Sequence, residues 1–206
     1  MVAPYDSLLC FASLRSRVHL LGRRSGMAEL HIIGQLVSAS GFPKHSLFCK
    51  WGIHAGRAWK LIEGLHEGQT QVDNPHTGDV AYLCHPIDVH YATKGLQGWP
   101  KLHLQVWHLD NFGRSDLFGY GFCHVPSTPG CHRLTCVTWR PTGNWQERLA
   151  HGFVGGGPQL KSADLVYGGT NRYRLHTVAA GQVPQKRLNR SERYFGWVIL
   201  RLPGVK

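Results

Sequence analysis

Histidine and cysteine are the residues of this chain with the greatest potential for chemistry, because imidazole and thiolate groups bind metals and act as bases or nucleophiles. The 206 residues include 14 histidines and 6 cysteines. The tightest group is Cys131 and Cys136, with Cys123, His124 and His132 nearby, and it lacks the paired Cys-x2–4-Cys spacing of a structural zinc site. On a continuous strand, Cys131 and Cys136 would face opposite sides. We therefore expect free thiols and no metal site.

A catalytic arrangement is not recognisable in the sequence. The histidine pairs His85 and His90, or His124 and His132, do not have the spacing of a zincin motif. We interpret the histidines as scattered residues of the surface and of edge strands. The chain has no Gly-x-Ser-x-Gly turn, and Gly157–Ser162 lacks the glycine that a phosphate-binding loop places before its lysine. The sequence thus predicts no enzyme, no cofactor and no small-molecule substrate.

Carboxylates are scarce, and only Asp110 and Asp116 are placed like a calcium-binding loop pair. Calcium takes six to eight oxygen ligands, usually with several carboxylates, so two are too few. We expect Asp110 to cap a turn and Asp116 to face solvent.

The formal charge of +11 suggests nucleic acid or an acidic membrane surface as a partner. Its distribution weakens that suggestion. Residues 1–26 carry four basic and one acidic residues, and residues 182–206 carry six and one, whereas residues 27–181 carry thirteen and ten. Because the body is nearly balanced, the sequence predicts no nucleic-acid groove, and we expect the tryptophans to lie in a core or at a partner surface.

The charge and composition divide the chain into three parts. Residues 1–26 form an atypical leader that we expect to be disordered: Asp6 precedes its apolar patch and its arginines follow, the reverse of a secretory signal. Residues 27–181 form the folded domain, and residues 182–206 form an atypical basic tail. No apolar run approaches the length of about 20 residues that crosses a bilayer.

Short β-prone runs fill the predicted domain, separated by turn signals rich in glycine, proline, asparagine and aspartate. The runs are Glu29–Val37, Ser46–His54, Trp59–Ile62, Ala81–Cys84 with Ile87–Tyr91, Lys101–Leu109, Leu117–Val125, Arg133–Trp139 and Arg172–Val178. This spacing predicts an all-β antiparallel sandwich. One short helix is expected where Trp145, Leu149 and Phe153 recur at intervals of four after Asn144.

A β-hairpin is predicted at Gly98–Pro126, where two of these runs flank the turn Asp110–Arg114. Alternation assigns Leu102, Leu104 and Val106 to a core face and leaves Lys101, His103, Gln105 and Trp107 on the other. The second run carries Gly119 and Gly121 on either side of Tyr120. Glycine inside a strand indicates a bulge or a close backbone approach.

Several longer segments, covering most of residues 27–181, closely resemble the B9 family of ciliary proteins, whose domain is a C2-like β-sandwich. They are Glu29–Gly41, Ser46–Ala55, Gly68–Asp73, His85–Val106, Phe112–Arg114, Gly119–Pro126 and Phe153–Leu160. The resemblance implies a non-enzymatic scaffold of the tectonic-like, or Meckel syndrome, complex, which supports ciliogenesis and limits diffusion of membrane proteins into the cilium. It implies sister B9 proteins as partners, and a location in the cytoplasm and cytoskeleton, at the basal body and the ciliary transition zone.

Under this resemblance the hairpin residues become candidates for fixing the C2-like shape and forming a partner surface. They are Trp99, Pro100, Trp107, Asp110, Gly113, Arg114, Gly119, Tyr120 and Gly121. The alternative is a C2-like domain that binds anionic lipid through basic loops and the cationic tail. The tail departs from the family's closing strand, so we expect the sandwich to fold poorly unless Trp197–Leu202 replaces that strand.

Overall fold

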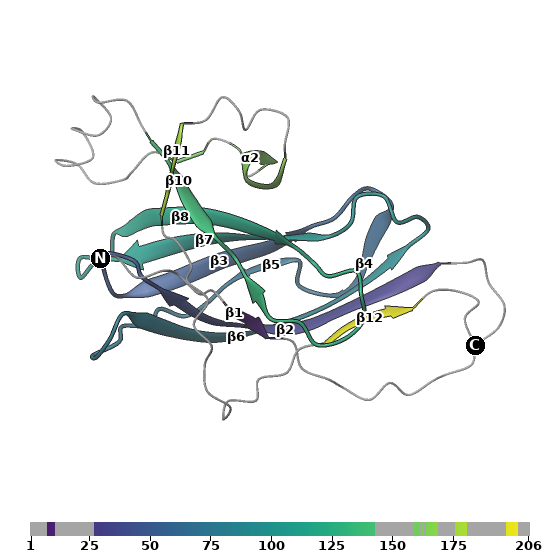
Figure 1. Cartoon of the computed structure of the whole chain (residues 1–206), viewed down its shortest axis with the longest axis horizontal. Coiled ribbons are helices and arrows are strands. Elements are labelled where there is room, and N and C mark those ends of the chain that lie inside the picture. The colour runs from purple at the N-terminus through teal and green to yellow at the C-terminus, as the bar shows by residue number, and fades with distance from the viewer. Residues whose placement is uncertain are drawn as a thin grey trace.

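The computed structural model describes residues 8–10, 27–142, 159–160, 162, 164–168, 176–180 and 197–201 as two antiparallel sheets packed in layers (Figure 1). Sheet A has the order β4 (Trp59–Gly64), β6 (Val80–Thr93), β2 (Ala28–Ser40), β1 (Leu8–Cys10) and β9 (Leu134–Thr135), and β12 (Trp197–Arg201) also pairs with β2. Sheet B has the order β11 (Thr177–Ala179), β10 (Thr138–Pro141), β8 (Ser115–His124), β7 (Lys101–Leu109), β3 (Leu47–His54) and β5 (Glu67–Gln69). The predicted all-β antiparallel sandwich is therefore confirmed.

The main core lies between the sheets and is built by strand alternation. On β7, Leu102, Leu104 and Val106 are at most 3% exposed, as predicted. On β2, Leu30 and Ile32 are equally buried and face them from the other sheet. Each such side chain contributes about 1.5–3 kcal/mol by leaving water.

A second hydrophobic cluster covers part of the outer face of sheet B. It contains Phe48, Trp107, Leu117, Tyr120, Trp139 and Val166, the last of which comes from the short helix α2 (Asp164–Tyr167). Figure 1 shows α2 on the side of sheet B away from sheet A. The prediction that Trp107 points away from the main core is correct, but Trp107 is only 9% exposed because this cluster covers it. Within the described segments, no helix has the length and apolar character required to span a membrane.

Strand β6 corrects the predicted break between Ala81–Cys84 and Ile87–Tyr91, because Val80–Thr93 is one strand. Its irregularity is a bulge opposite Leu36 and Ser38, where Cys84 has a φ of 45°. Pro86 follows within the strand and pairs with Gln35 of β2. Strand β4 reaches only Val89 on the opposite edge of β6, so the missing amide hydrogen of Pro86 costs no bond to β4.

The predicted strand Arg133–Trp139 is also wrong in one respect, since the chain changes sheets within it. Leu134–Thr135 forms β9 in sheet A and Thr138–Pro141 forms β10 in sheet B. Between them, Cys136 is completely buried in the main core. A strand that crosses from one sheet to the other closes a corner of the sandwich.

Both ends of the chain contribute strands to one edge of β2. The tail segment predicted as a replacement edge strand forms β12, whose Trp197–Arg201 pairs with Ile33–Glu29 of β2. Leu8–Cys10, inside the segment predicted as a disordered leader, forms β1 and pairs with β2 and β9 further along. Of the predicted Arg172–Val178 run, β11 contains Thr177 and Val178. The predicted helix over residues 144–153 lies outside the described residues.

Candidate functional site

The nine hairpin residues singled out in the sequence lie in three separate places along β7 and β8. Trp99 and Pro100 lie at the entrance to β7, where the Trp99 indole donates a hydrogen bond of 2.6 Å to the Val125 carbonyl. The Trp99 ring meets Trp59 edge-on, with centroids 5.2 Å apart. Val125 in turn donates from its amide to the Pro100 carbonyl at 3.2 Å. These two hydrogen bonds connect the residues just before β7 to the residue just after β8 at this end of the hairpin.

Trp107, Gly119, Tyr120 and Gly121 lie in the middle of the hairpin, on and around the outer cluster of sheet B. The register between β7 and β8 shifts at Val106 and Trp107, which confirms the predicted bulge beside Gly119. A methyl group on Gly121 would lie 2.7 Å from the Cys136 sulfur, so this glycine permits a close approach. Tyr120 accepts a 3.0 Å hydrogen bond from the Leu160 amide.

Asp110, Gly113 and Arg114 form the tip of the hairpin, at the opposite end from Trp99. The turn is closed by Gly113 donating to the Asp110 carbonyl at 2.9 Å, and Gly113 has a φ of 79°. Asp110 also accepts from Arg114 at 2.9 Å, and this bond lowers the pKa of Asp110 below its usual value. The Asp110 carboxylate also accepts from the Asn111 amide at 2.6 Å, which confirms its predicted turn-capping role. Asp116 is half-buried, so its predicted exposure is wrong.

An exposed aromatic ring projects at this tip. Phe112 is 84% exposed, and the Arg114 guanidinium lies over its ring at 5.5 Å from the centroid. The exposed Lys44, from the loop before β3, acts electrostatically on Asp110. The tip therefore presents one large apolar group beside two cations.

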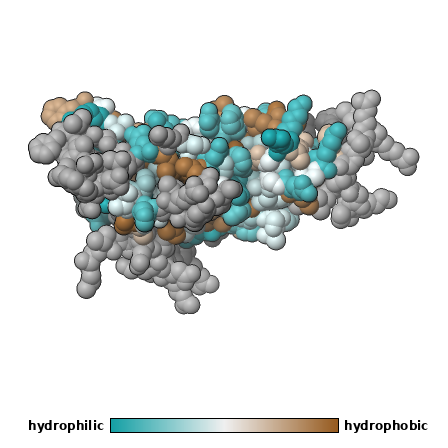
Figure 2. Space-filling model, turned by 90° about the horizontal axis from the view of Figure 1, so that it is seen from above, coloured by the Kyte–Doolittle hydropathy of each residue, from teal (hydrophilic) through white to brown (hydrophobic). Residues whose placement is uncertain are grey.

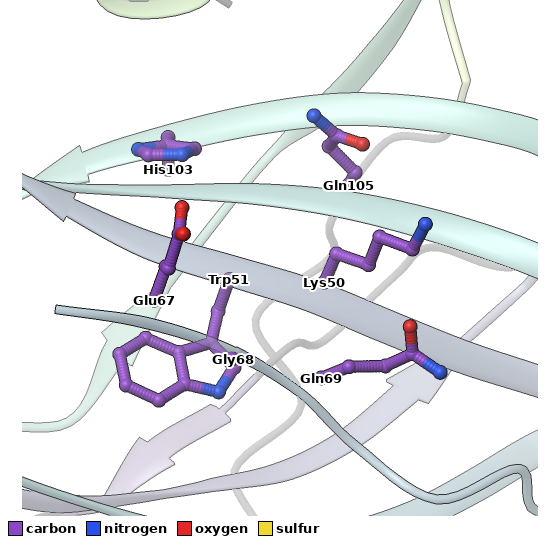
Figure 3. A pocket seen from close by; sticks show the side chains of 7 residues that line it. All are labelled: Lys50, Trp51, Glu67, Gly68, Gln69, His103 and Gln105. Atoms are coloured by element: carbon purple, nitrogen blue, oxygen red, sulfur yellow. The ribbon is translucent and has the colours of Figure 1, made fainter. Parts of the chain in front are cut away.

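A shallow groove of about 390 Å³ lies on sheet B, where β3, β5 and β7 run side by side (Figure 3). Its lining consists of Lys50, Trp51, Glu67, Gly68, Gln69, His103 and Gln105. Lys50 is opposite both Gln69 and Gln105 in the strand register, and its ammonium lies 4.8 Å from the Trp107 ring centre. In Figure 3 the Glu67 carboxylate points toward His103. The polar side chains of the groove offer hydrogen-bond donors and acceptors. The groove lies at an edge of sheet B, because β5 is the last strand of that sheet in the described part.

The cysteines described in the core are packing residues. Burial raises the pKa of Cys49 to about 12. The pKa of Cys136 is raised well above its usual range by its hydrogen bond to Cys123 and by burial. Both therefore remain neutral thiols at physiological pH, which is unsuited to nucleophilic catalysis.

The histidines are less scattered than the sequence indicates. His108 is only 8% exposed, stacks on Phe118 with centroids 5.4 Å apart and bonds through its ring to the His45 carbonyl. His90 lies beside His31 and Glu29, and these three form the one group of potential metal ligands in the described segments. The strand pairing that joins His31 to His90 is long-range, so sequence spacing could not reveal it.

Figure 2 shows the face seen from above, where hydrophilic residues separate small hydrophobic patches.

The sequence model of a family described as "Ciliary basal body-associated, B9 protein" matches residues 30–186. The chain belongs to this B9 family. The matched region contains both sheets of the sandwich apart from β1 and β12 and the first two residues of β2.

Named B9 relatives match the same region. B9 domain-containing protein 2 of Danio rerio is 71% identical over 157 residues, 76% of this chain and 90% of the relative. The Homo sapiens protein of that name is 67% identical over the same shares. B9 domain-containing protein 1 of Xenopus laevis is 30% identical, over 69% of this chain and 74% of the relative. Among solved structures, a C2 domain of RIM from Drosophila aligns with a TM-score of 0.33 at 13% identity, over 54% of this chain and 98% of that domain.

Proposed function

We propose that this chain is a non-enzymatic scaffold subunit of the tectonic-like complex at the ciliary transition zone, where it binds sister B9 proteins. The observation that carries the proposal is the match to B9 domain-containing protein 2, at 71% identity for the Danio rerio relative, across the sandwich. In this role the protein supports ciliogenesis and the barrier to membrane-protein diffusion, and it works in the cytoplasm and cytoskeleton at the basal body. The buried, neutral thiols of Cys49 and Cys136 fit a structural use of the reactive residues.

The groove beside β5 is the surface that we assign to a sister protein. Gln69 and Gln105 lie on either side of Lys50. The Gln69 amide can both donate and accept hydrogen bonds, whereas the Gln105 oxygen already accepts from the Trp107 indole at 3.2 Å, which leaves the Gln105 NH2 group to donate. Strand β5 is also an edge strand in the described part, and an edge strand offers backbone groups to a partner. Polar side chains beside a free backbone edge suit a transient or assembly interface rather than a small-molecule pocket.

Co-expression with the two sister B9 proteins tests the scaffold role. The full chain should co-elute with both in size-exclusion chromatography as one complex. Gln105→Lys should weaken this association, because it places a second cation beside Lys50 in the groove. Tyr82→Lys is the matched control, since Tyr82 is 61% exposed on the other sheet. A folded chain that never co-elutes would contradict the scaffold role, and equal binding by both variants would exclude only the groove.

The hairpin tip favours a second function, in which the domain binds an anionic membrane directly. Phe112 is 84% exposed and lies beside Arg114, and Lys44 acts electrostatically on Asp110 of the same turn, a combination suited to inserting an aromatic ring among acidic headgroups. Sedimentation with phosphatidylserine vesicles separates the two functions. Salt-sensitive binding that is lost in Phe112→Ser, without sister proteins present, would favour the membrane role. Recruitment to vesicles only when the sister proteins are present would favour the scaffold role.

A further inference from the structure

The outer face of sheet A carries a histidine pair at its centre. His31 of β2 and His90 of β6 are direct partners in the antiparallel register. Glu29 lies two residues before His31, so strand periodicity places its side chain on the same face. Figure 1 shows β2 and β6 running together along the layer that faces away from α2. Two adjacent strands thus place two imidazoles and one carboxylate on one surface.

The three side chains are close enough to share one ligand. One ligand atom from each residue can be chosen so that all three lie within 4.8 Å of one another. The imidazole rings are stacked with centroids 3.7 Å apart and planes inclined by 19°. The His90 Nε2 atom lies 3.9 Å from the Glu29 carboxylate, too far for a hydrogen bond.

The Nε2 atom of His90 is buried and has no hydrogen-bond partner. A buried polar nitrogen without a partner is costly, because it has lost its hydrogen bond to water without replacement. The donor atoms around it belong to Glu29 and His31, and neither is placed to satisfy it. A bound ion would supply the missing contact.

Protonation of the pair would oppose its packing, since two imidazolium rings in a stack repel each other. Further carboxylates, Glu63 of β4 and Asp88 of β6, also act electrostatically on His31. Arg201 of β12 is the register partner of Glu29. Glu29, Asp88 and Glu63 therefore supply the negative charge near the histidine pair that favours a bound cation.

We propose that Glu29, His31 and His90 bind a divalent transition metal, with Zn²⁺ as the ion best matched to two imidazoles and a carboxylate. Zinc takes nitrogen ligands at about 2.0–2.1 Å in a tetrahedral shell, so bound donors would lie about 3.4 Å apart. Both rings have to rotate out of their stack to bind one ion, because nitrogen lone pairs lie in the ring planes, and this rotation also has to draw the donor atoms together from separations of up to 4.8 Å. The fourth position is left for water or for Glu63, which pairs with His90 from β4. An ion held in this way would join β2 to β6 through their side chains, independently of any partner protein.

Equilibrium dialysis of the full chain against Zn²⁺ near neutral pH tests this site. His31→Gln and His90→Gln should each bind about one Zn²⁺ fewer than the wild type, or bind it about tenfold or more weakly, and Glu29→Gln should weaken it less. His76→Gln is the matched control, because His76 lies in an exposed loop away from sheet A's histidine pair. All variants retain the same cysteines, so thiol binding cancels in the comparison.

A thermal melt of the same proteins provides a second readout. Zn²⁺ should raise the melting temperature of the wild type and of His76→Gln, because a ligand that binds the folded state stabilises it. It should not raise that of His90→Gln. Equal zinc binding and equal melting shifts in all variants would overturn the site. Should His31→Gln not fold, Glu29→Gln decides the matter, because its side chain is 41% exposed and the substitution is nearly isosteric.

Discussion

The two outer faces of this sandwich arise from the same alternating strand pattern but differ in what lies over them. On sheet B, Trp107 and Tyr120 point outward and are nonetheless buried, because Val166 of α2 packs against them. On sheet A, most outward residues of β6 are exposed, Tyr82 by 61%, and only His90 among them is half-buried in the described part of that strand's central stretch, Tyr82, Cys84, Pro86, Asp88 and His90. Alternation thus decides which way a side chain points, whereas its burial depends on segments elsewhere in the chain.

The largest expected effect comes from removing an aromatic ring on the covered face. Trp107→Ala should lower the free energy of unfolding by about 3–5 kcal/mol, because it leaves a cavity in the outer cluster. Tyr82→Ala on the open face should change it by less than about 0.5 kcal/mol. Urea denaturation monitored by circular dichroism measures both. Similar losses for the two variants would show that the two faces do not differ in their contribution to stability.

A smaller effect is expected from adding one methyl group at Gly121, which lies on β8 beside β10. In Gly121→Ala the new carbon would lie 2.7 Å from the Cys136 sulfur and 3.1 Å from the Val137 carbonyl oxygen. Because the completely buried Cys136 side chain and the neighbouring Val137 carbonyl must shift to relieve this overlap, the variant should lose about 1–3 kcal/mol of stability. In Gly95→Ala the added carbon meets nothing within 4 Å, so that variant is the control. If Gly121→Ala is as stable as Gly95→Ala, the close approach of β8 to the Cys136 segment is not rigid.

The contrast between the faces also explains which features the sequence could reveal. The core face of β7 is predictable because alternation is local, and the Asp110–Arg114 turn is predictable because Gly113 follows a capping aspartate. The burial of Trp107 is not predictable, since α2 begins at Asp164 and has only four residues. The continuity of β6 through Pro86 depends on where β4 ends, which the local sequence does not show.

The candidate functional residues also divide into those that the sequence could reveal and those that only the fold brings together. The nine hairpin residues can be identified from their motifs, but their distribution over both ends and the middle of the hairpin requires the three-dimensional fold. His31 and His90 belong to strands whose pairing closes a long loop, and either histidine alone resembles an ordinary outward strand residue. Only the register between β2 and β6 brings them together. Long-range pairing is what a single sequence specifies least directly.

A single hydrogen bond on the covered face should have a smaller effect than either packing change. Tyr120→Phe removes the hydroxyl that accepts from the Leu160 amide at 3.0 Å. We expect a loss of about 0.5–1.5 kcal/mol, since the amide loses a partner while the ring remains in place. Tyr82→Phe removes an exposed hydroxyl and should change nothing measurable. Equal stability of the two variants in urea would show that solvent replaces the lost bond on the covered face.

The smallest expected effect is a change in pH dependence on sheet B. Burial, with a contribution from nearby His54, lowers the pKa of His103 below its ordinary value of 6.5, although Glu67 opposes the shift. The unfolded chain therefore takes up the proton at a higher pH than the folded chain. The stability associated with neutral His103 is complete above a pH of about 6.5 and is lost as the pH falls toward the folded-state value.

Because the lowered pKa of His103 makes the protein less stable at acidic pH, urea titrations at about pH 7.5 and about pH 5.5 should give different midpoints. The midpoint of the wild type should fall on acidification, and that of His103→Gln should fall less. Part of the fall should remain, because burial also lowers the pKa values of His85 and His31. His76→Gln, in an exposed loop, should keep the full wild-type fall. If His103→Gln loses as much stability as His76→Gln on acidification, the acid sensitivity arises on sheet A and not beneath the groove of sheet B.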